Sequence, residues 1–180
     1  FRVAERGPLS VAAVVQPRFQ SYSGGDSPAL AGMADRHRTA EGGVRARLRT
    51  GRFHVGVRAV SDLLGRHGGQ EVTADVGVRL GGPALTLSPS AGVTWQSADF
   101  VDYYYGVRPD EARAGRPAYA GDAATNPFVA TAARLRLDKR WGVFALVRHT
   151  WLDAPITASP IVDSNTDFSG VLALTFAFGT

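Results

Sequence analysis

Apolar side chains recur at every second position along most of this chain. From residue 71 to residue 80 they occupy the even positions, whereas Glu71, Asp75 and Arg79 stand at odd ones. A helix would scatter such a set around its circumference, but a β-strand places it on one face. The same alternation recurs elsewhere, and it predicts about nine strands, at residues 1–5, 9–19, 43–50, 52–60, 70–80, 84–97, 126–137, 141–152 and 167–178.

The connections between these segments alternate in length. Short turns such as Thr50-Gly51 and Gly81-Gly82-Pro83 are separated by long stretches at about 20–42, 61–69, 98–125 and 153–166, which show no helical period. Tight turns thus lie at one end and long, solvent-exposed loops at the other, as in outer-membrane barrels. We expect an all-β, antiparallel, up-and-down transmembrane β-barrel in one domain, residues 1–180. A soluble sandwich or a lipocalin-type barrel is the alternative.

Aromatic spacing favours the membrane barrel. Trp141 and Trp151 lie on one face and would span roughly 23 Å along the membrane normal, close to the apolar band of ~25 Å in such barrels. The tyrosine run at 103–105 falls at a loop-side strand end, where it would anchor in the membrane interface or bind a sugar or protein. The predicted aromatic girdle comprises Phe19, Phe53, Trp95, Tyr103, Tyr105, Trp141, Trp151, Phe168, Phe176 and Phe178.

Strand parity bears on the whole barrel. A bacterial barrel with both termini on the periplasmic side has an even number of strands. If the last strand runs down to the short-turn side at Phe178, the first of nine strands also runs downward. An odd number of strands is then expected before Phe1, which makes a barrel of ten or twelve strands.

Nearly all the basic residues are arginines, since Lys139 is the only lysine among 20 basic residues. Many of these arginines stand at the polar positions of the predicted strands. Rings of guanidinium groups attract anions, so one hypothesis is an anion-selective pore. The alternative is a salt-bridged plug, which the small lumen of such a barrel favours. The predicted lumen-facing residues are Arg45, Arg47, Arg49, Arg58, Glu71, Asp75, Arg79, Arg134, Arg136 and Arg148.

Composition excludes several other classes. The chain has no cysteine, which excludes thiolate metal sites and thiol catalysis, and no apolar run long enough for a spanning helix. Its arginines form no basic tail, which argues against nucleic-acid binding despite a pI of 10.0. The four histidines lack metal-ligand spacing. Ser61, Asp62, His67 and His149 could be nominated for hydrolysis, but no nucleophile motif supports them. We expect no cofactor, no metal and no enzyme activity.

Three loop segments resemble a known family. Residues 102–112 are Asp-Tyr-Tyr-Tyr-Gly-Val-Arg-Pro-Asp-Glu-Ala, residues 159–162 are Ser-Pro-Ile-Val, and residues 26–32 are Asp-Ser-Pro-Ala-Leu-Ala-Gly. Together they resemble loops of the MltA-interacting protein (MipA)/OmpV family, although Ala158 stands where the family commonly has aspartate. The motif residues are Tyr104, Tyr105, Gly106, Val107, Ser159 and Pro160.

The resemblance implies an outer-membrane location in a Gram-negative cell, in contact with outer-membrane lipid. It also implies a scaffold that joins a lytic transglycosylase to a murein synthase. Other members of the family are porin-like or adhesin-like. A scaffold is therefore the first functional expectation, a narrow anion-preferring channel the second and an adhesin the third.

Overall fold

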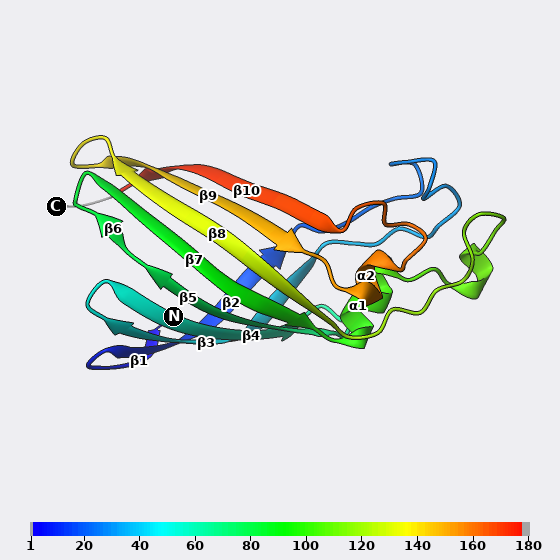
Figure 1. Ribbon diagram of the computed structural model, residues 1–180, viewed down its shortest axis with the longest axis horizontal. Helices are drawn as coiled ribbons and strands as arrows, with labels where there is room; N and C mark the ends of the chain where they lie inside the picture. The colour runs from blue at the N-terminus through cyan, green and yellow to red at the C-terminus, as the bar shows by residue number, and fades with distance from the viewer. Residues whose placement is uncertain (1, 178–180) are drawn as a thin grey trace.

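The computed structural model describes residues 2–177, with side chains from residue 7 onward, and it forms one curled antiparallel sheet (Figure 1). Along the sheet the order is β1-β2-β3-β4-β5-β7-β8-β9-β10, and the short β6 pairs with β7. The predicted up-and-down meander of nine long strands is confirmed, while Phe178 lies outside the described residues. The strands are β1 (Arg2–Arg6), β2 (Leu9–Arg18), β3 (Thr39–Thr50), β4 (Phe53–Asp62), β5 (Gln70–Val78), β6 (Leu80–Gly81), β7 (Leu85–Gln96), β8 (Ala124–Arg136), β9 (Trp141–Trp151) and β10 (Thr166–Phe176).

The strand ends reflect pairing more than local sequence. Gly7 and Gly51 sit in the turns with φ of +56° and +57°, a conformation that tight hairpin turns require and that glycine adopts without steric cost. β3 begins at Thr39 rather than at residue 43, because its pairing with β2 continues past the two glycines at 42–43 to Thr39 opposite Arg18.

Three helical segments lie at the long-loop end of the sheet (Figure 1): α1 (Ala98–Tyr105), the 3-10 helix η1 (Pro109–Glu111) and α2 (Ala154–Thr157). The prediction of non-helical, exposed loops at 98–125 and 153–166 is therefore wrong for these segments. Ser97 caps α1 by accepting a hydrogen bond from the Phe100 amide at 3.4 Å. Phe100, Val101 and Tyr104 share one helical face, and their burial stabilises the short helix.

None of the helices that the structure describes has the length and apolar character needed to cross a membrane.

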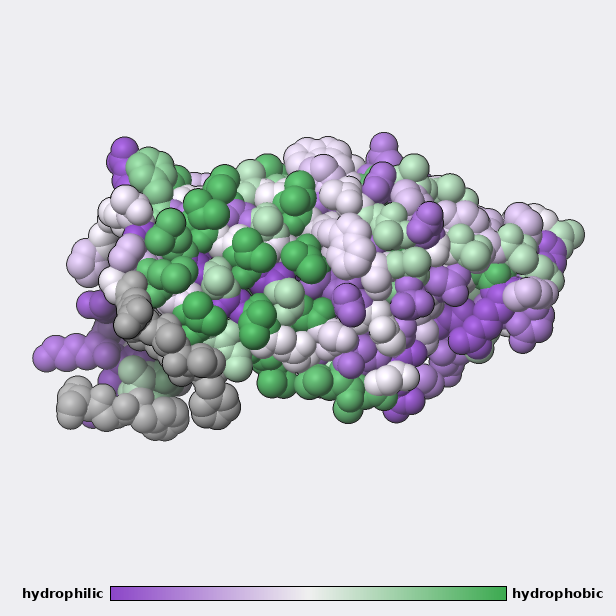
Figure 2. Space-filling view, turned by 90° about the horizontal axis from the view of Figure 1, so that it is seen from below, coloured by the Kyte–Doolittle hydropathy of each residue, from purple (hydrophilic) through white to green (hydrophobic). Residues whose placement is uncertain are grey.

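The sheet has two chemically different faces. One face carries the side chains of Glu41, Glu71 and Asp75, and we call it the concave face. The sheet curls toward this side, since Arg18 of β2 reaches Glu71 of β5 across β3 and β4. The opposite, convex face carries the apolar side chains, among them Val57, which is 46% exposed. Figure 2 shows apolar residues gathered over the strands and more hydrophilic ones toward the loop end. An exposed apolar surface of this kind fits a lipid solvent rather than water.

The main cluster of buried apolar residues lies under the long loops rather than inside the sheet. Phe100, Val101, Tyr104, Ala124 and Ile156 are 0–1% exposed and pack together where α1, α2 and the start of β8 meet. The loop end is thus a packed body with its own core.

Candidate functional site

The ten predicted lumen residues all fall on the concave face or directly after a strand in the same alternation. The pairing of neighbouring strands puts the side chains of those within strands on the same side of the sheet. Arg79 follows the last residue of β5. That this face encloses a lumen stays a prediction. The set consists of Arg45, Arg47, Arg49, Arg58, Glu71, Asp75, Arg79, Arg134, Arg136 and Arg148.

A dense ion-pair network occupies the loop-side half of this face. Glu71 accepts hydrogen bonds from Arg18 at 2.8 Å, Arg58 at 3.0 Å and Gln96 at 3.2 Å. Glu41 accepts a second bond from Arg18 at 2.6 Å. The side chains of Glu41 and Glu71 are only 1% and 7% exposed, so nearly all their hydrogen-bonding partners come from the protein. We call Arg18, Glu41, Arg58 and Glu71 the concave network.

Beside this network lies a polar cavity of about 320 Å³, lined by residues from β2 to β10 and by Tyr105 of α1. Arg148 faces it from β9 and donates to the Thr94 hydroxyl at 2.7 Å. The Arg148 guanidinium also lies 3.7 Å from the centroid of the Phe128 ring, a cation–π contact. Most of the lining groups thus already bond one another, which favours a filled interior over an open channel.

Helix α1 closes the loop-side end of the concave face. Its Phe100 ring lies 4.6 Å below the Arg18 guanidinium and 5.1 Å from the His67 ring. Gly69, just before β5, allows this close approach, since a Cβ there would lie 2.6 Å from the Phe100 amide nitrogen. The helix therefore sits directly on the network.

The long loops join one another through a second, separate ion pair. Arg36 and Glu111 approach to 2.9 Å, and their side chains are 1% and 3% exposed. Glu111 also accepts hydrogen bonds from the amides of Ala34 at 2.9 Å and Arg108 at 3.0 Å. Arg116 donates to two carbonyls of the loop before β3 and to the Glu111 carbonyl. We call the body formed by residues 20–38, 63–69, 97–123 and 152–165 the loop cap.

The family-motif residues build this loop cap. Tyr104 is 1% exposed in the core, and the Tyr105 carbonyl accepts a hydrogen bond from the Ser159 hydroxyl. Val107, 2% exposed, pairs with Tyr119 as an isolated bridge. Gly106 ends α1, where a Cβ would lie 2.3 Å from the Asp102 carbonyl oxygen. Pro160 follows Ser159 after α2. In this structure the motif holds loops together.

The predicted positions of Tyr103 and Tyr105 at a strand end are wrong. Both lie on α1, where the Tyr103 hydroxyl accepts from the His37 amide and the Tyr105 hydroxyl accepts from Gln20. Their neighbour Tyr104 is buried, because consecutive helical residues point in different directions and α1 packs on the sheet end.

The other described girdle residues point to the convex face near strand ends, and their role as a membrane girdle stays a prediction. Trp141 and Phe176 contact each other edge to face, with ring centroids 4.7 Å apart. The loop-side group is Phe19, Trp95, Trp151 and Phe168, and the turn-side group is Phe53, Trp141 and Phe176.

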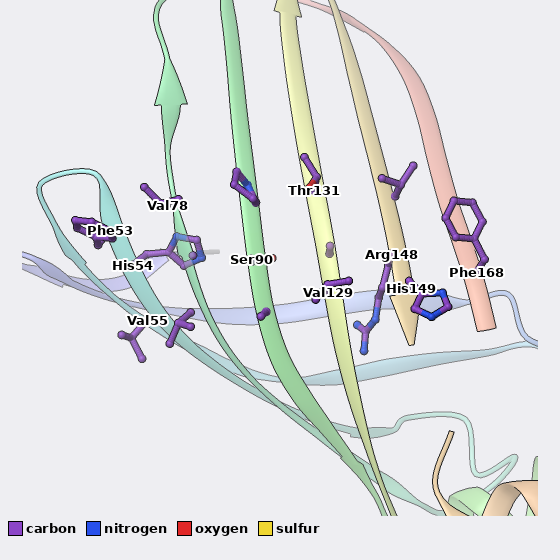
Figure 3. Close-up of a pocket in the computed structure, with 16 residues that line it drawn as sticks. Phe53, His54, Val55, Val78, Ser90, Val129, Thr131, Arg148, His149 and Phe168 are labelled. Atoms are coloured by element: carbon purple, nitrogen blue, oxygen red, sulfur yellow. The ribbon is translucent and has the colours of Figure 1, made fainter. Parts of the chain in front are cut away.

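The convex face also has an apolar hollow of about 730 Å³, running from β4 to β10. Figure 3 shows Phe53 and Phe168 at its opposite ends, with Val129 between them. Its mainly hydrocarbon walls suit acyl chains better than a polar ligand.

The residues nominated for hydrolysis do not form one site. The Asp62 carboxylate accepts from the Thr39 hydroxyl and from the amides of His67 and Gly68, so it shapes its own loop. The His67 ring nitrogen Nδ1 accepts from the Gly69 amide at 3.0 Å. His149 lies apart on the convex face, 4.7 Å from Trp151 between ring centroids.

Several important residues were missed from the sequence. Arg18 occupies a polar position of an alternating strand, so the period-two pattern could have found it. Glu41 falls within the stretch predicted as a loop at 20–42, so the strand pattern does not point to it. Arg36 and Glu111 lie 75 residues apart, and no local pattern connects them.

Acid should loosen the loop cap. Burial by itself raises the pKa of Glu111, but hydrogen bonds from Arg36 and from the amides of Arg108 and Ala34 outweigh it and lower the pKa to about 2. Stability from a carboxyl with a lowered folded-state pKa is fully present above its unfolded pKa and is lost as the pH falls through the folded pKa. We expect the cap to lose about 3 kcal/mol between about pH 4.5 and about pH 2.

Hydrogen exchange of the Ala34 and Arg108 amides, corrected for intrinsic rates, measures this loss. Protection should fall progressively between about pH 4.5 and about pH 2 in the wild type. Glu111→Gln should show reduced protection already at neutral pH and no acid step. Parallel acid profiles for the two proteins would contradict the assignment to Glu111.

Comparison with known proteins is consistent with this architecture. The family model described as MltA-interacting protein MipA matches residues 1–178. The chain is 29% identical to the putative outer membrane protein YiaT of Escherichia coli K12, over 85% of this chain and 58% of that protein. It is 30% identical to the outer membrane protein Omp26La of Vibrio anguillarum, over 80% of this chain and 56% of that protein. It is 35% identical to the MltA-interacting protein of E. coli K12, over 45% of this chain and 33% of that protein.

No solved structure matches the chain significantly. The chain spans a little over half the length of YiaT and Omp26La. The family model covers nearly all of the chain, and the matched relatives are named as outer membrane proteins. The chain therefore belongs to the MltA-interacting protein (MipA) family and is an outer-membrane protein of the β-barrel type.

Proposed function

We propose that this chain is part of a non-catalytic outer-membrane scaffold that holds a lytic transglycosylase, and with it a murein synthase, at the membrane. Support for a partner comes from the E. coli relative, which is named for its interaction with MltA. The short turns of this chain would face the periplasm, where such enzymes act on murein, and its long loops would face outward.

The closed loop end is the observation that carries the structural part of the proposal. Phe100 and Tyr105 of α1 cover the concave network, and the loop cap packs around them with buried side chains. A solute would have to displace both the helix and the ion pairs to pass. Such an interior suits a rigid, plugged barrel better than a pore.

A narrow anion-preferring channel is the second candidate. It is favoured by the guanidinium groups of Arg45, Arg49, Arg134 and Arg136, which form no ion pair with a described residue. A surplus of positive charge at one mouth would attract anions. Conduction would still require the concave network to open.

Two measurements on the full-length protein separate these functions. In the first, tagged barrel in detergent is mixed with a purified lytic transglycosylase of the MltA type, with an unrelated outer-membrane barrel as control bait. In the second, the same preparation is tested in planar bilayers, after its heat-modifiable gel mobility confirms folding. We expect selective capture and a silent bilayer. Stepwise anion-preferring currents without capture would replace the scaffold by the channel.

A further inference from the structure

The cations of the concave face differ along the barrel axis. In the loop-side half, Arg18 and Arg58 are bonded to carboxylates in the concave network. Among the side chains that the structure describes in the turn-side half, Arg47 alone has a carboxylate in reach, Asp75 at 3.7 Å. The other cations there form no ion pair with a described residue. They are Arg49, Arg79, Arg134 and Arg136.

Two of these cations, Arg134 and Arg136, line a hollow of about 1000 Å³ at the turn ends of β7 to β10. We call it the turn-side hollow, and its walls include aromatic as well as charged groups. Among its described lining residues the single carboxylate is that of Asp138, whose oxygen accepts from the amides of Arg140 at 2.7 Å and Trp141 at 2.8 Å. Asp138 is thus engaged in its own turn, and a positive surplus remains. The charged and aromatic lining residues are Arg134, Arg136, Asp138, Lys139, Arg140, Trp141, Phe144 and Phe176.

The position of the arginines decides between a lipid and a protein occupant. Arg134 and Arg136 lie on the concave face, whereas Leu135 between them belongs to the convex, lipid-side face. The lining residues Leu135, Trp141 and Phe176 belong to the convex face, where a lipid headgroup would meet them, whereas Arg134 and Arg136 project from the opposite face of the sheet. A chain segment that enters from the periplasm at the short turns would meet both arginines directly.

The chemistry of the hollow specifies that segment. Guanidinium groups bind carboxylates with paired hydrogen bonds, so glutamate and aspartate side chains fit Arg134 and Arg136. The Phe144 ring, with the Arg134 guanidinium 5.3 Å from its centroid, offers an apolar contact beside them. The short turns alone are too small for a standard protein interface of about 800 Å² per partner. A segment inserted into the hollow would add the missing contact area.

We infer that the turn-side hollow is the docking site for an acidic segment of a periplasmic protein partner. This inference rests on the proposed scaffold function, because it names the face of the barrel that the held enzyme would contact. It also predicts that capture weakens with salt, since exposed charge pairs are screened.

The test uses folded full-length protein and a labelled polyglutamate peptide as the probe. Arg134→Glu with Arg136→Glu should weaken peptide binding by roughly tenfold or more at low ionic strength. Lys139→Glu with Arg140→Glu, on the turn itself, is a second variant with little risk to folding, and it should act in the same direction. The matched control reverses Arg38 and Arg66, exposed cations of the loop cap, and should leave binding within about twofold.

Capture of the transglycosylase by the same variants separates the docking inference from the proposed scaffold function. If the wild type captures the enzyme and both turn-side variants capture it equally well, the docking inference is overturned and the scaffold stands. If peptide binding is lost in those variants while no variant or wild type captures the enzyme, the docking site stands and the proposed scaffold fails. Absence of peptide binding to the wild type, or a turn-side effect only on affinity for phosphatidylglycerol vesicles, would overturn the inference.

Discussion

Replacing Glu71 by alanine should lower the free energy of unfolding of the full-length barrel by about 3 kcal/mol. Its carboxylate accepts hydrogen bonds from Arg18, Arg58 and Gln96. Without it, the Arg18 and Arg58 side chains, which are 15% and 29% exposed, lose a carboxylate partner, and a largely buried charge with less compensation is costly. Urea unfolding in lipid vesicles, with the folded fraction read from heat-modifiable gel mobility, measures the loss.

Arg136→Ala is the matched control on the same face. Arg136 is exposed and has no ion pair with a described residue, so its removal should change stability by less than about 0.5 kcal/mol. Adding Arg58→Ala to Glu71→Ala should cost less than the two single changes summed, because one orphaned cation disappears. Equal losses for Glu71→Ala and Arg136→Ala would show that the concave network is not what stabilises the barrel.

An arginine in place of Val57 should destabilise the folded barrel in lipid by about 2 to 4 kcal/mol. Val57 lies in the middle of β4 on the convex face, among other exposed apolar side chains. There an arginine side chain would have to leave water for hydrocarbon. Its cross-strand neighbours among the described residues are Ala46 and Ala74, and neither offers a carboxylate to pair with it. The same vesicle unfolding assay measures the effect.

Ser90→Arg, on β7, places the same charge on the concave face. Because that face already holds arginines and polar groups, the cost should be less than half that of Val57→Arg. A lipid-soluble reagent should also label cysteine at position 57 and spare cysteine at position 47. The reverse order of costs, or labelling at position 47 alone, would invert the assignment of the two faces.

Helix α1 shows where local pattern was insufficient. The stretch 98–125 is rich in small and polar residues. Within it, α1 has only eight residues, about two helical turns, and three buried positions, Phe100, Val101 and Tyr104. So short a helix is marginal by itself. It forms because Ser97 caps it and because Gly69 lets it pack against the start of β5, and the second of these contacts joins segments that lie far apart in the sequence.

The sequence by itself determined the strands, their antiparallel order and the division of their side chains between two faces. The reason is that a period of two leaves each residue one choice of face, so Arg45, Arg134 and Arg148 had to share one. Only the tertiary structure decided which charges are paired. Arg18 meets Glu71 from 53 residues away because the sheet curls, and Arg36 meets Glu111 because two loops fold over the same end. Register and curvature set these distances, and neither is encoded in any single strand.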